Sequence, residues 1–327
     1  YGHDWAVKLL RAHAGWDKLR HAYLLVGPQG VGRRSLALRF AQALNCTASD
    51  TPGEPCGECR ECRQIWAMQH PDMSLLEPEE GHKDIRIDQV RALQHTLALS
   101  PYSAKYRIAL LPNFQRATEE ASNALLKTLE EPPDKVVLLL TADALENLLP
   151  TIVSRCEVIR LRPASIANAE TYLQSERSLD AEQAHLLAHL SGGRIGAAIR
   201  LAEEPESLNQ RHETLETLLE MLSATRVDRF RLAEELTKSY DKAREKAGAA
   251  ISIWLSFWRD VFVNASGAAL PLVNVDFSDQ VDRVTAALDI VDARALVLAH
   301  EEALAQLDAY ANVRLVLEDL MLRWPRL

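Results

Sequence analysis

The sequence predicts an α/β domain built on a parallel sheet, followed by a second half that is entirely helical. Two observations carry this prediction. Up to about residue 160, short apolar runs typical of buried parallel strands alternate with segments of helical periodicity; the clearest runs are residues 22–26, 106–111 and 136–141. After Pro163, the periodic segments repeat their apolar residues at helical spacing only.

Length and composition are those of an ordinary globular protein. The chain has 327 residues, room for two or three domains, and is 47% hydrophobic and 25% charged. No apolar run approaches the roughly 20 residues that a membrane span requires. Asp4, Lys8 and Arg11 interrupt the start, which is therefore unlike a signal peptide. We expect a cytoplasmic protein that does not associate with a membrane.

The net charge of −9 is unevenly distributed. Residues 1–163 hold 20 Lys and Arg against 20 Asp and Glu, whereas residues 164–327 hold 17 against 26. An acidic second half is poorly suited to binding a phosphate backbone. Any contact with nucleic acid is therefore expected from the first half, or from partner subunits.

The first strand, residues 22–26, runs into a degenerate phosphate-binding loop. Residues 27–34 read Gly-Pro-Gln-Gly-Val-Gly-Arg-Arg and have the outline of G-x-x-x-x-G-K-[ST], ahead of a helical pattern at residues 36–44. The glycines allow backbone N–H groups to curl around an anion at the helix start. However, the lysine is replaced by Arg33 and the magnesium-binding hydroxyl by Arg34. An arginine cannot ligate Mg²⁺.

The strand expected at residues 106–111 lacks the other half of a magnesium site. A working ATPase carries acidic residues at this point, which hold Mg²⁺ and position the attacking water. Here the strand is followed by Pro112-Asn113. We therefore expect a nucleotide-binding fold whose own catalytic centre is lost, with ATP or ADP and Mg²⁺ bound weakly or not at all. The residues of this degenerate site are Gly27, Gly30, Gly32, Arg33, Arg34 and Ser35.

Four of the five cysteines form a cluster with metal-binding spacing, C-x9-C-x2-C-x2-C; they are Cys46, Cys56, Cys59 and Cys62. In a cytosolic protein such a cluster indicates a metal before it indicates disulfides. Two overlapping C-x2-C steps suit tetrahedral zinc held by four thiolates. The alternative is a set of free structural cysteines, but this polar segment offers thiols no apolar surroundings. We expect a structural zinc module at residues 46–63.

The remaining elements follow from the same periodicities. In the first half they are a helical turn at residues 5–10, strands at 73–76 and 157–161, and helices at 85–99 and 118–131. In the second half we expect helices at residues 165–174, 181–190, 196–202, 208–222, 226–238, 243–263 and 293–324. Asp180 is a good N-cap for the second of these. Trp254, Phe257 and Trp258 are interpreted as core residues.

Two segments carry a resemblance to a known family. Residues 123–133, Asn-Ala-Leu-Leu-Lys-Thr-Leu-Glu-Glu-Pro-Pro, followed by Ser154-Arg155-Cys156, resemble the bacterial DNA polymerase III clamp-loader subunits, which are AAA+ proteins. The four-cysteine insertion after the loop helix is similar to that family too. In it the gamma/tau subunits keep the lysine, the hydroxyl and the Asp-Glu pair. The delta-prime subunits keep the Ser-Arg-Cys arginine and often lose their own site, and this chain resembles them.

The resemblance covers the whole chain and implies three domains. These are an AAA+ P-loop domain at residues 1–163 with the zinc module inside it, a small helical lid at 164–206, and an oligomerising collar at 207–327. It places Thr141 at the sensor-1 position. It also implies that the sensor-2 arginine is replaced by Gly196, although Arg194 lies close in sequence.

The function that the resemblance implies is that of a non-hydrolysing stator. The chain would join gamma/tau and delta subunits, in the DNA polymerase III holoenzyme, and help load the sliding clamp on primed DNA. Arg155 would be an arginine finger for ATP bound on a neighbouring gamma/tau subunit. Lys127 and Glu130 share a helix face that the resemblance places near Arg155; the alternative is a solvated ion pair.

Alternative functions remain open on the sequence alone. Arg155 could be an ordinary surface arginine. The chain could be a gamma/tau-like ATPase with an atypical loop, which would hydrolyse ATP by itself. It could also be a zinc-bearing adaptor in which Arg155 is dispensable.

Overall fold

The chain forms two compact units, described here one by one. The computed structural model describes residues 2–15, 18–51, 53–238 and 242–327. The first, the α/β unit, comprises the chain up to Asn168 together with Arg194–Ala197. The second, the helical unit, comprises Ala169–Gly193 and Ala198–Leu327.

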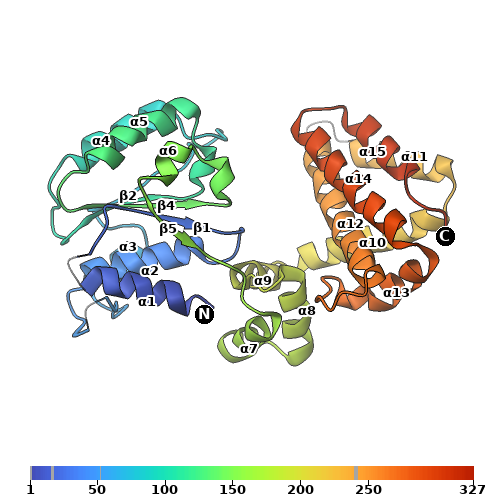
Figure 1. The fold of residues 1–327 in the computed structure, drawn as a ribbon, viewed down its shortest axis with the longest axis horizontal. Helices are drawn as coiled ribbons and strands as arrows, with labels where there is room; N and C mark the ends of the chain where they lie inside the picture. Colours follow the sequence, from blue (N-terminus) through green and yellow to red (C-terminus); the bar gives the residue numbers. More distant parts are fainter. Residues whose placement is uncertain (1, 16–17, 52, 239–241) are drawn as a thin grey trace. The chain divides into compact units, whose positions relative to one another are not determined.

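A parallel sheet of five strands forms the centre of the α/β unit, as the sequence predicts (Figure 1). The strand order is β2-β3-β4-β1-β5, and every neighbouring pair is parallel. All residues of β1, β3 and β4 are buried, which explains their uninterrupted apolar sequences. The strands are β1 (Ala22–Val26), β2 (Met73–Leu75), β3 (Arg107–Leu111), β4 (Val136–Ala142) and β5 (Glu157–Arg160).

Helices cover both faces of this sheet (Figure 1). Alternate side chains of β1 point to opposite faces, so Tyr23 and Leu25 join one core and Leu24 joins the other. The first face is covered by α1 (Asp4–Gly15) and α2 (Arg33–Asn45), with α3 (Arg60–Trp66) packed on α2. The second is covered by α4 (Ile87–Leu97), α5 (Glu119–Glu130) and the short α6 (Pro150–Val153).

The helix α3 begins inside the cysteine segment and continues to Trp66, although the sequence predicts only an insertion held by metal there. The Sγ of Cys59 accepts a hydrogen bond from the backbone N–H of Cys62 and so takes the place of an N-cap oxygen. Buried Gln42 of α2 donates to the carbonyl of Cys62 at 2.6 Å. The segment is therefore attached to the α/β core as well as to its own sulfurs.

The chain after β5 is helical, as predicted. Asp180 caps α8, because its Oδ1 accepts from the N–H of Gln183 at 2.8 Å. The helices are α7 (Ile166–Arg177), α8 (Ala181–Ser191), α9 (Ile195–Glu203), α10 (Pro205–Ser223), α11 (Arg226–Thr237), α12 (Ala243–Ala265), α13 (Ser278–Ala287), α14 (Ile290–Asp308) and α15 (Val313–Leu322).

The single helix predicted at residues 293–324 is wrong. The structure has two helices there, α14 and α15, because the chain turns at Tyr310, whose φ is +61°. Asn312 then caps α15 by accepting from the N–H of Leu315 at 3.2 Å. The helix α13 is also absent from the sequence analysis.

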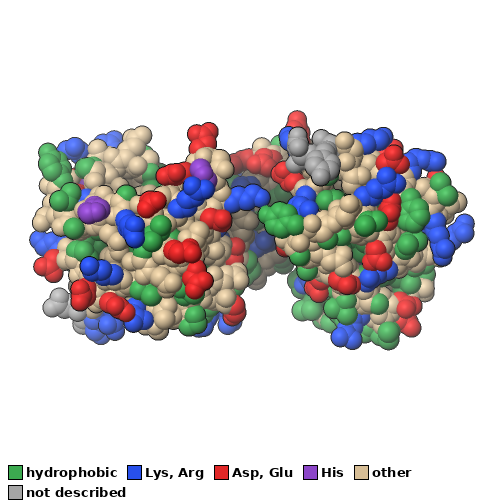
Figure 2. Space-filling view, turned by 90° about the horizontal axis from the view of Figure 1, so that it is seen from above, with side chains coloured by type: hydrophobic (Ala, Val, Ile, Leu, Met, Phe, Trp, Pro, Cys, Tyr) green, Lys and Arg blue, Asp and Glu red, His purple; other side chains and the backbone are tan. Residues whose placement is uncertain are grey.

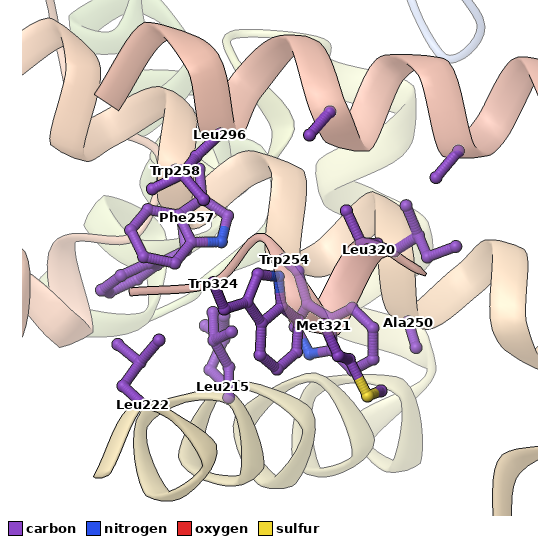
Figure 3. Packing of buried hydrophobic residues seen from close by; sticks show 14 of the residues in the cluster. Leu215, Leu222, Ala250, Trp254, Phe257, Trp258, Leu296, Leu320, Met321 and Trp324 are labelled. Atoms are coloured by element: carbon purple, nitrogen blue, oxygen red, sulfur yellow. The ribbon is translucent and has the colours of Figure 1, made fainter. Parts of the chain in front are cut away.

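The core of the helical unit surrounds the long helix α12, which packs against α10, α13 and α14. Figure 3 shows part of this core, with side chains from α10, α12, α14 and α15. Trp254, Phe257 and Trp258 are at most 1% exposed, which confirms their interpretation as core residues. Trp254 meets the Trp324 ring edge-on, with ring centroids 5.0 Å apart. Arg229 is also buried, and its guanidinium donates to backbone carbonyls in the last turns of α10 and α15 and just beyond α15; the acceptors are Met221, Leu222, Met321, Trp324 and Pro325.

The surface is mixed in charge. Figure 2 shows Lys and Arg side chains intermingled with Asp and Glu on the visible face of each unit. Among the described residues on that face, neither unit presents a continuous basic stripe suited to a phosphate backbone. Within the described part of the chain, no helix is both long and apolar enough to cross a bilayer.

The buried His300 predicts how the stability of the helical unit depends on pH. Its Nδ1–H donates to the carbonyl of Leu296 at 2.7 Å and its Nε2 accepts from the Trp324 indole at 3.3 Å. Burial lowers the pKa of His300 to about 4. The unfolded chain therefore takes up a proton first, so stability is fully present above about pH 6.5 and is lost as the pH falls toward 4. We expect a loss of about 3 kcal/mol from this group between pH 7 and pH 4.

Denaturant unfolding between pH 7 and pH 4 would measure this. In His300→Leu, which has no titratable group at this position, the free energy of unfolding should depend less on pH than in wild type. His212→Leu, at a half-exposed histidine, should keep the pH dependence of wild type. Equal slopes for wild type and His300→Leu would contradict the assignment.

Candidate functional site

The glycine-rich loop connects the carboxyl end of β1 to the start of α2, the place of a phosphate-binding loop in an α/β fold. Gly30 and Gly32 have φ values of +83° and +106°, which favour glycine. The N–H of Gly27 donates to the carbonyl of Ala142, the last residue of β4. The loop thus has the backbone conformation that its sequence predicts, at the carboxyl edge of the sheet.

The first turn of α9 packs directly on this loop. The N–H of Gly196 donates to the carbonyl of Gly30 at 2.9 Å. A Cβ on Gly30 would lie 2.7 Å from the Cβ of Ala197, and a Cβ on Gly196 would lie 2.9 Å from the Gly30 oxygen. Both glycines are therefore required by close packing. The residue that the resemblance places at the sensor-2 position, Gly196, is in contact with the loop.

Arg33, which stands at the lysine position, turns toward the ends of β3 and β4. Its side chain is only 7% exposed, and its Nη1 lies 2.6 Å from Oδ1 of Asp143. Its Nη2 donates to Oδ1 of Asn113 at 3.2 Å. The second oxygen of Asp143 accepts from the Gln115 amide at 2.7 Å. The carboxylate after β4 is thus occupied on both oxygens by groups of the chain itself.

The backbone conformation after β3 accounts for the asparagine at position 113. Its φ of +52° is left-handed, a conformation that asparagine tolerates better than most residues. Its backbone N–H donates to the hydroxyl of Thr141 at 2.9 Å. The predicted sensor-1 residue is therefore 2% exposed and fastens the end of β3 to β4.

Arg34 and Ser35 lie away from this centre. Both are exposed in the first turn of α2, and Nη1 of Arg34 lies 3.2 Å from Oε1 of Glu77. On the other side of the loop, Nε2 of His3 lies 2.8 Å from the carbonyl of Val31. The residue that takes the place of the magnesium-binding hydroxyl is thus an exposed cation paired with an acid outside the loop.

Arg155 lies just after α6, about one third exposed. Its Nη2 donates to Oε1 of Glu130 at 2.6 Å, and its Nη1 donates to the carbonyl of Thr151 at 3.0 Å. The structure therefore brings together the two segments that carry the resemblance, because Glu130 ends α5. The carboxylate of Glu130 is paired with Arg155 rather than with Lys127. Burial raises the pKa of the neighbouring Cys156 thiol to about 12, so this cysteine is protonated at neutral pH.

The four clustered cysteines meet in space. Their sulfur atoms all lie within 4.8 Å of one another, and the Cys46–Cys59 and Cys56–Cys62 pairs are 4.0 Å apart. Tetrahedral zinc with Zn–S bonds of about 2.3 Å requires sulfurs roughly 3.8 Å apart. Three of the sulfurs accept hydrogen bonds from backbone N–H groups. The N–H of Cys56 donates to Sγ of Cys46, that of Cys59 to Sγ of Cys56, and that of Cys62 to Sγ of Cys59. The donor set and its spacing fit a metal ion.

The thiols differ in acidity. Burial acts against ionisation, but backbone N–H groups of Thr47 and Cys62 hold the pKa of Cys59 at about 6. Hydrogen bonds from the backbone of Cys56 and Ala48 likewise outweigh burial and lower the pKa of Cys46. Burial raises the pKa of Cys62. The thiolate, the form that binds metals, is thus favoured at Cys59 and becomes easier to form at Cys46.

Sequence reasoning placed the helix of Glu130 near Arg155, but it did not identify the partners of Arg33. Asp143, which pairs with Arg33, and Gln115, which donates to Asp143, lie beyond the ends of β4 and β3. The sequence did contain one signal for Asp143, because an acidic residue directly after a buried parallel strand lies at the edge of the sheet where ligands bind. Apart from the two glycines themselves, nothing in the sequence indicated that Gly196 contacts Gly30.

The protein has a parallel sheet with helices on both faces, and a glycine-rich loop connects the first strand to the next helix. These features define an α/β protein of the nucleotide-binding-loop class. Comparison with known families is more specific. A family model described as "DNA polymerase III, delta subunit" matches residues 2–165, and one described as "DNA polymerase III, delta subunit, C terminal" matches residues 205–326. The chain belongs to the DNA polymerase III delta-prime subunit family.

Individual relatives agree with this assignment. The chain is 32% identical over 312 residues to the DNA polymerase III subunit delta' of Yersinia pestis, a match that covers 93% of this chain and 88% of that one. It is 39% identical over 200 residues to the subunit delta' of Pseudomonas aeruginosa, covering 61% of each. It is 30% identical over 213 residues to the subunit tau of Escherichia coli, covering 62% of this chain and 32% of tau. The resemblance recognised in the sequence is confirmed.

The contact between Arg33 and Asp143 should be energetically significant, because the guanidinium is almost fully buried. A double-mutant cycle with Arg33→Ala and Asp143→Ala should give a coupling energy of about 1–2 kcal/mol. The matched cycle with Arg34→Ala and Glu77→Ala, an exposed pair, should give less than about 1 kcal/mol. Denaturant unfolding of the four variants measures both. Equal couplings in the two cycles would show that Arg33 is not held as described.

Proposed function

We propose that this chain is the non-hydrolysing stator of a clamp loader in DNA replication. The observation that carries the proposal is the arrangement of Arg33, whose guanidinium lies against Asp143 and Asn113 at the carboxyl edge of the sheet. Supporting it are membership of the delta-prime family and the exposed arginine after α6.

The electrostatics of the loop argue against hydrolysis by this chain. Mg²⁺ needs several oxygen ligands in near-octahedral geometry, and phosphoryl transfer needs the metal beside the phosphates. At the positions of the lysine and the hydroxyl, this loop carries two guanidinium groups. The nearby carboxylate of Asp143 is neutralised by Arg33 and accepts from Gln115 with its other oxygen. Organising magnesium here would require taking the Asp143 carboxylate away from a nearly buried guanidinium.

Arg155 is the residue that we assign to catalysis in trans. A guanidinium presented to the γ-phosphate of ATP on an adjacent subunit stabilises the charge that develops during hydrolysis. In the isolated chain this guanidinium is held by Glu130 and by a backbone carbonyl, and it remains partly exposed. A triphosphate has a higher charge density than one carboxylate. We infer that Arg155 exchanges Glu130 for phosphate when the neighbouring subunit docks.

The partners follow from the same proposal. The chain would assemble with gamma/tau and delta subunits and act through them on the sliding clamp and primed DNA. The similarity to the tau subunit of Escherichia coli supports related subunits packing side by side in one complex. We keep the three-part organisation as part of the proposal: an AAA+ domain at residues 1–163, a lid at 164–206 and a collar at 207–327.

We also propose that Cys46, Cys56, Cys59 and Cys62 hold a structural zinc ion. Within the described part of the chain this group consists of four sulfurs, which fill a tetrahedral coordination sphere, so the ion would stabilise the segment rather than take part in a reaction. Bound to α3 and attached to α2 through Gln42, the module would be a rigid addition to the α/β unit.

Replacing Arg155 tests the role in trans. In a complex reconstituted with gamma/tau and delta subunits, Arg155→Ala should lower ATP turnover at the site that it faces by on the order of 10³-fold and reduce clamp loading. The assembly itself should persist in size-exclusion chromatography, because the side chain is partly exposed and contributes little to the core. Glu130→Gln, which releases the guanidinium without removing it, should keep turnover near the wild-type level.

Two outcomes would contradict the stator assignment. Undiminished turnover in the Arg155→Ala complex would instead favour a zinc-bearing adaptor. ATP hydrolysis by the purified chain alone, or tight Mg²⁺-dependent binding of ATP in isothermal titration, would favour a gamma/tau-like ATPase.

The zinc proposal is tested by metal content. The purified chain should carry zinc in elemental analysis, and Cys59→Ser should lose it, whereas Cys156→Ser, outside the cluster, should keep it. Because metal binding contributes roughly 10–16 kcal/mol of apparent local folding energy in small zinc modules, chelation should expose residues 46–63 to protease. Equal metal content in Cys59→Ser and wild type would disprove the site.

A further inference from the structure

We propose a second metal site in the helical unit, formed by Glu170, His185 and His189 and suited to a divalent transition-metal ion such as Zn²⁺. One ligand atom from each of these residues lies within 4.8 Å of the other two. Glu170 comes from α7, and both histidines come from α8. The site is separate from the cysteine cluster, which belongs to the α/β unit.

Helix geometry places the two histidines together. They are four residues apart on α8 and therefore share one face. Their ring centroids are 4.5 Å apart, with an angle of 52° between the planes. From α7, Oε1 of Glu170 reaches Nδ1 of His185 at 2.7 Å. The donor set is two imidazoles and one carboxylate.

A backbone carbonyl orients His189. Its Nδ1 lies 2.6 Å from the oxygen of Leu272, in the segment after α12, so Nδ1 carries the proton that is donated. The lone pair is then on Nε2, the nitrogen left available for a metal. A histidine ligand whose other nitrogen donates to a backbone carbonyl is a recurring arrangement in metal sites, because it fixes the tautomer and the ring.

His185 and Glu170 share the position that the ion would take. In the structure, the Nδ1 of His185 faces the carboxylate, with one proton between them. An ion bound by both groups replaces this proton, which in a neutral imidazole moves to Nε2. The carboxylate is therefore already directed at the nitrogen that it would join in the coordination sphere.

Exposure and donor type identify the class of ion. The side chain of His185 is 54% exposed and that of Glu170 is 26% exposed, so an ion can enter from solvent and water can complete its coordination. Imidazole nitrogen favours Zn²⁺, Ni²⁺ and Cu²⁺ over Ca²⁺ and Mg²⁺, which prefer oxygen ligands. The ion would join α7 to α8 and, through His189, stabilise their contact with the Leu272 segment.

The chain contains a matched control. His212 and Glu216 also lie one helical turn apart, with Nε2 of His212 3.4 Å from Oε1 of Glu216, but among the described residues they belong to no group of three possible ligands. A histidine of similar exposure is thus paired with a carboxylate without the third donor.

Zinc stoichiometry of the full-length chain, measured by elemental analysis after equilibrium dialysis against micromolar ZnCl₂, tests the proposal. Wild type should bind one more equivalent than His185→Gln and Glu170→Gln, whose affinity for this equivalent should fall at least about tenfold. His212→Gln should match wild type. Cys59→Ser should lose only the equivalent of the cysteine cluster, so failure of one site is distinguished from failure of the other.

A second readout is the melting temperature. Added ZnCl₂ should raise the Tm of wild type and of His212→Gln more than that of His185→Gln or Glu170→Gln, and circular dichroism should show all of them folded. Identical stoichiometry in wild type and both site variants would overturn the proposal. So would saturation of the extra equivalent only at millimolar zinc.

Discussion

The contact of Arg33 with Asp143 is the constraint on which the candidate site depends. A guanidinium that is 7% exposed cannot lose its carboxylate without leaving a buried charge unpaired, and that is costly. The contact joins the first turn of α2 to the residue after β4, and Asn113 adds the end of β3. Three elements that would surround a nucleotide in a working enzyme are instead tied to one another.

The two arginines of the candidate site, Arg33 and Arg155, differ in burial. Arg33 is buried and paired at the edge of the sheet, whereas Arg155 is partly exposed and paired with the half-exposed Glu130. An exposed ion pair contributes about 0–1 kcal/mol, so it can be exchanged for a better anion at little cost. The nearly buried guanidinium of Arg33 cannot lose its carboxylate as cheaply, because its charge would be left unpaired away from water. Burial thus assigns Arg33 a structural role, whereas Arg155 keeps a partly exposed guanidinium.

Much of the fold could be predicted because its signals are local. The strand at residues 22–26 is bounded by His21 and Gly27, and the structure has the same limits. The break between α14 and α15 could not be predicted, since no glycine or proline lies at residues 309–312 and the apolar period continues through it. The helix α3 was missed because its cap is a sulfur rather than one of the usual oxygen side chains. For the site, the degenerate loop was visible in the residue types, and the resemblance placed Glu130 near Arg155. The contact of Arg33 with Asp143 could not be predicted, because contacts between distant segments depend on the order of the strands in the sheet.

The packing of Gly30 on Gly196 has a consequence for how the sequence can change. Besides the Cβ of Ala197, a new side chain would meet backbone atoms on both sides, the nitrogen of Ala197 at 2.8 Å and the oxygen of Gly30 at 2.9 Å. Because backbone atoms are present whatever the residue type, no substitution at Ala197 or Gly30 removes them to make room. Any side chain at either position must move α9 off the loop, so no compensating mutation at the other glycine restores the fit. The two positions are locked to glycine together, independently of whether an anion is ever bound.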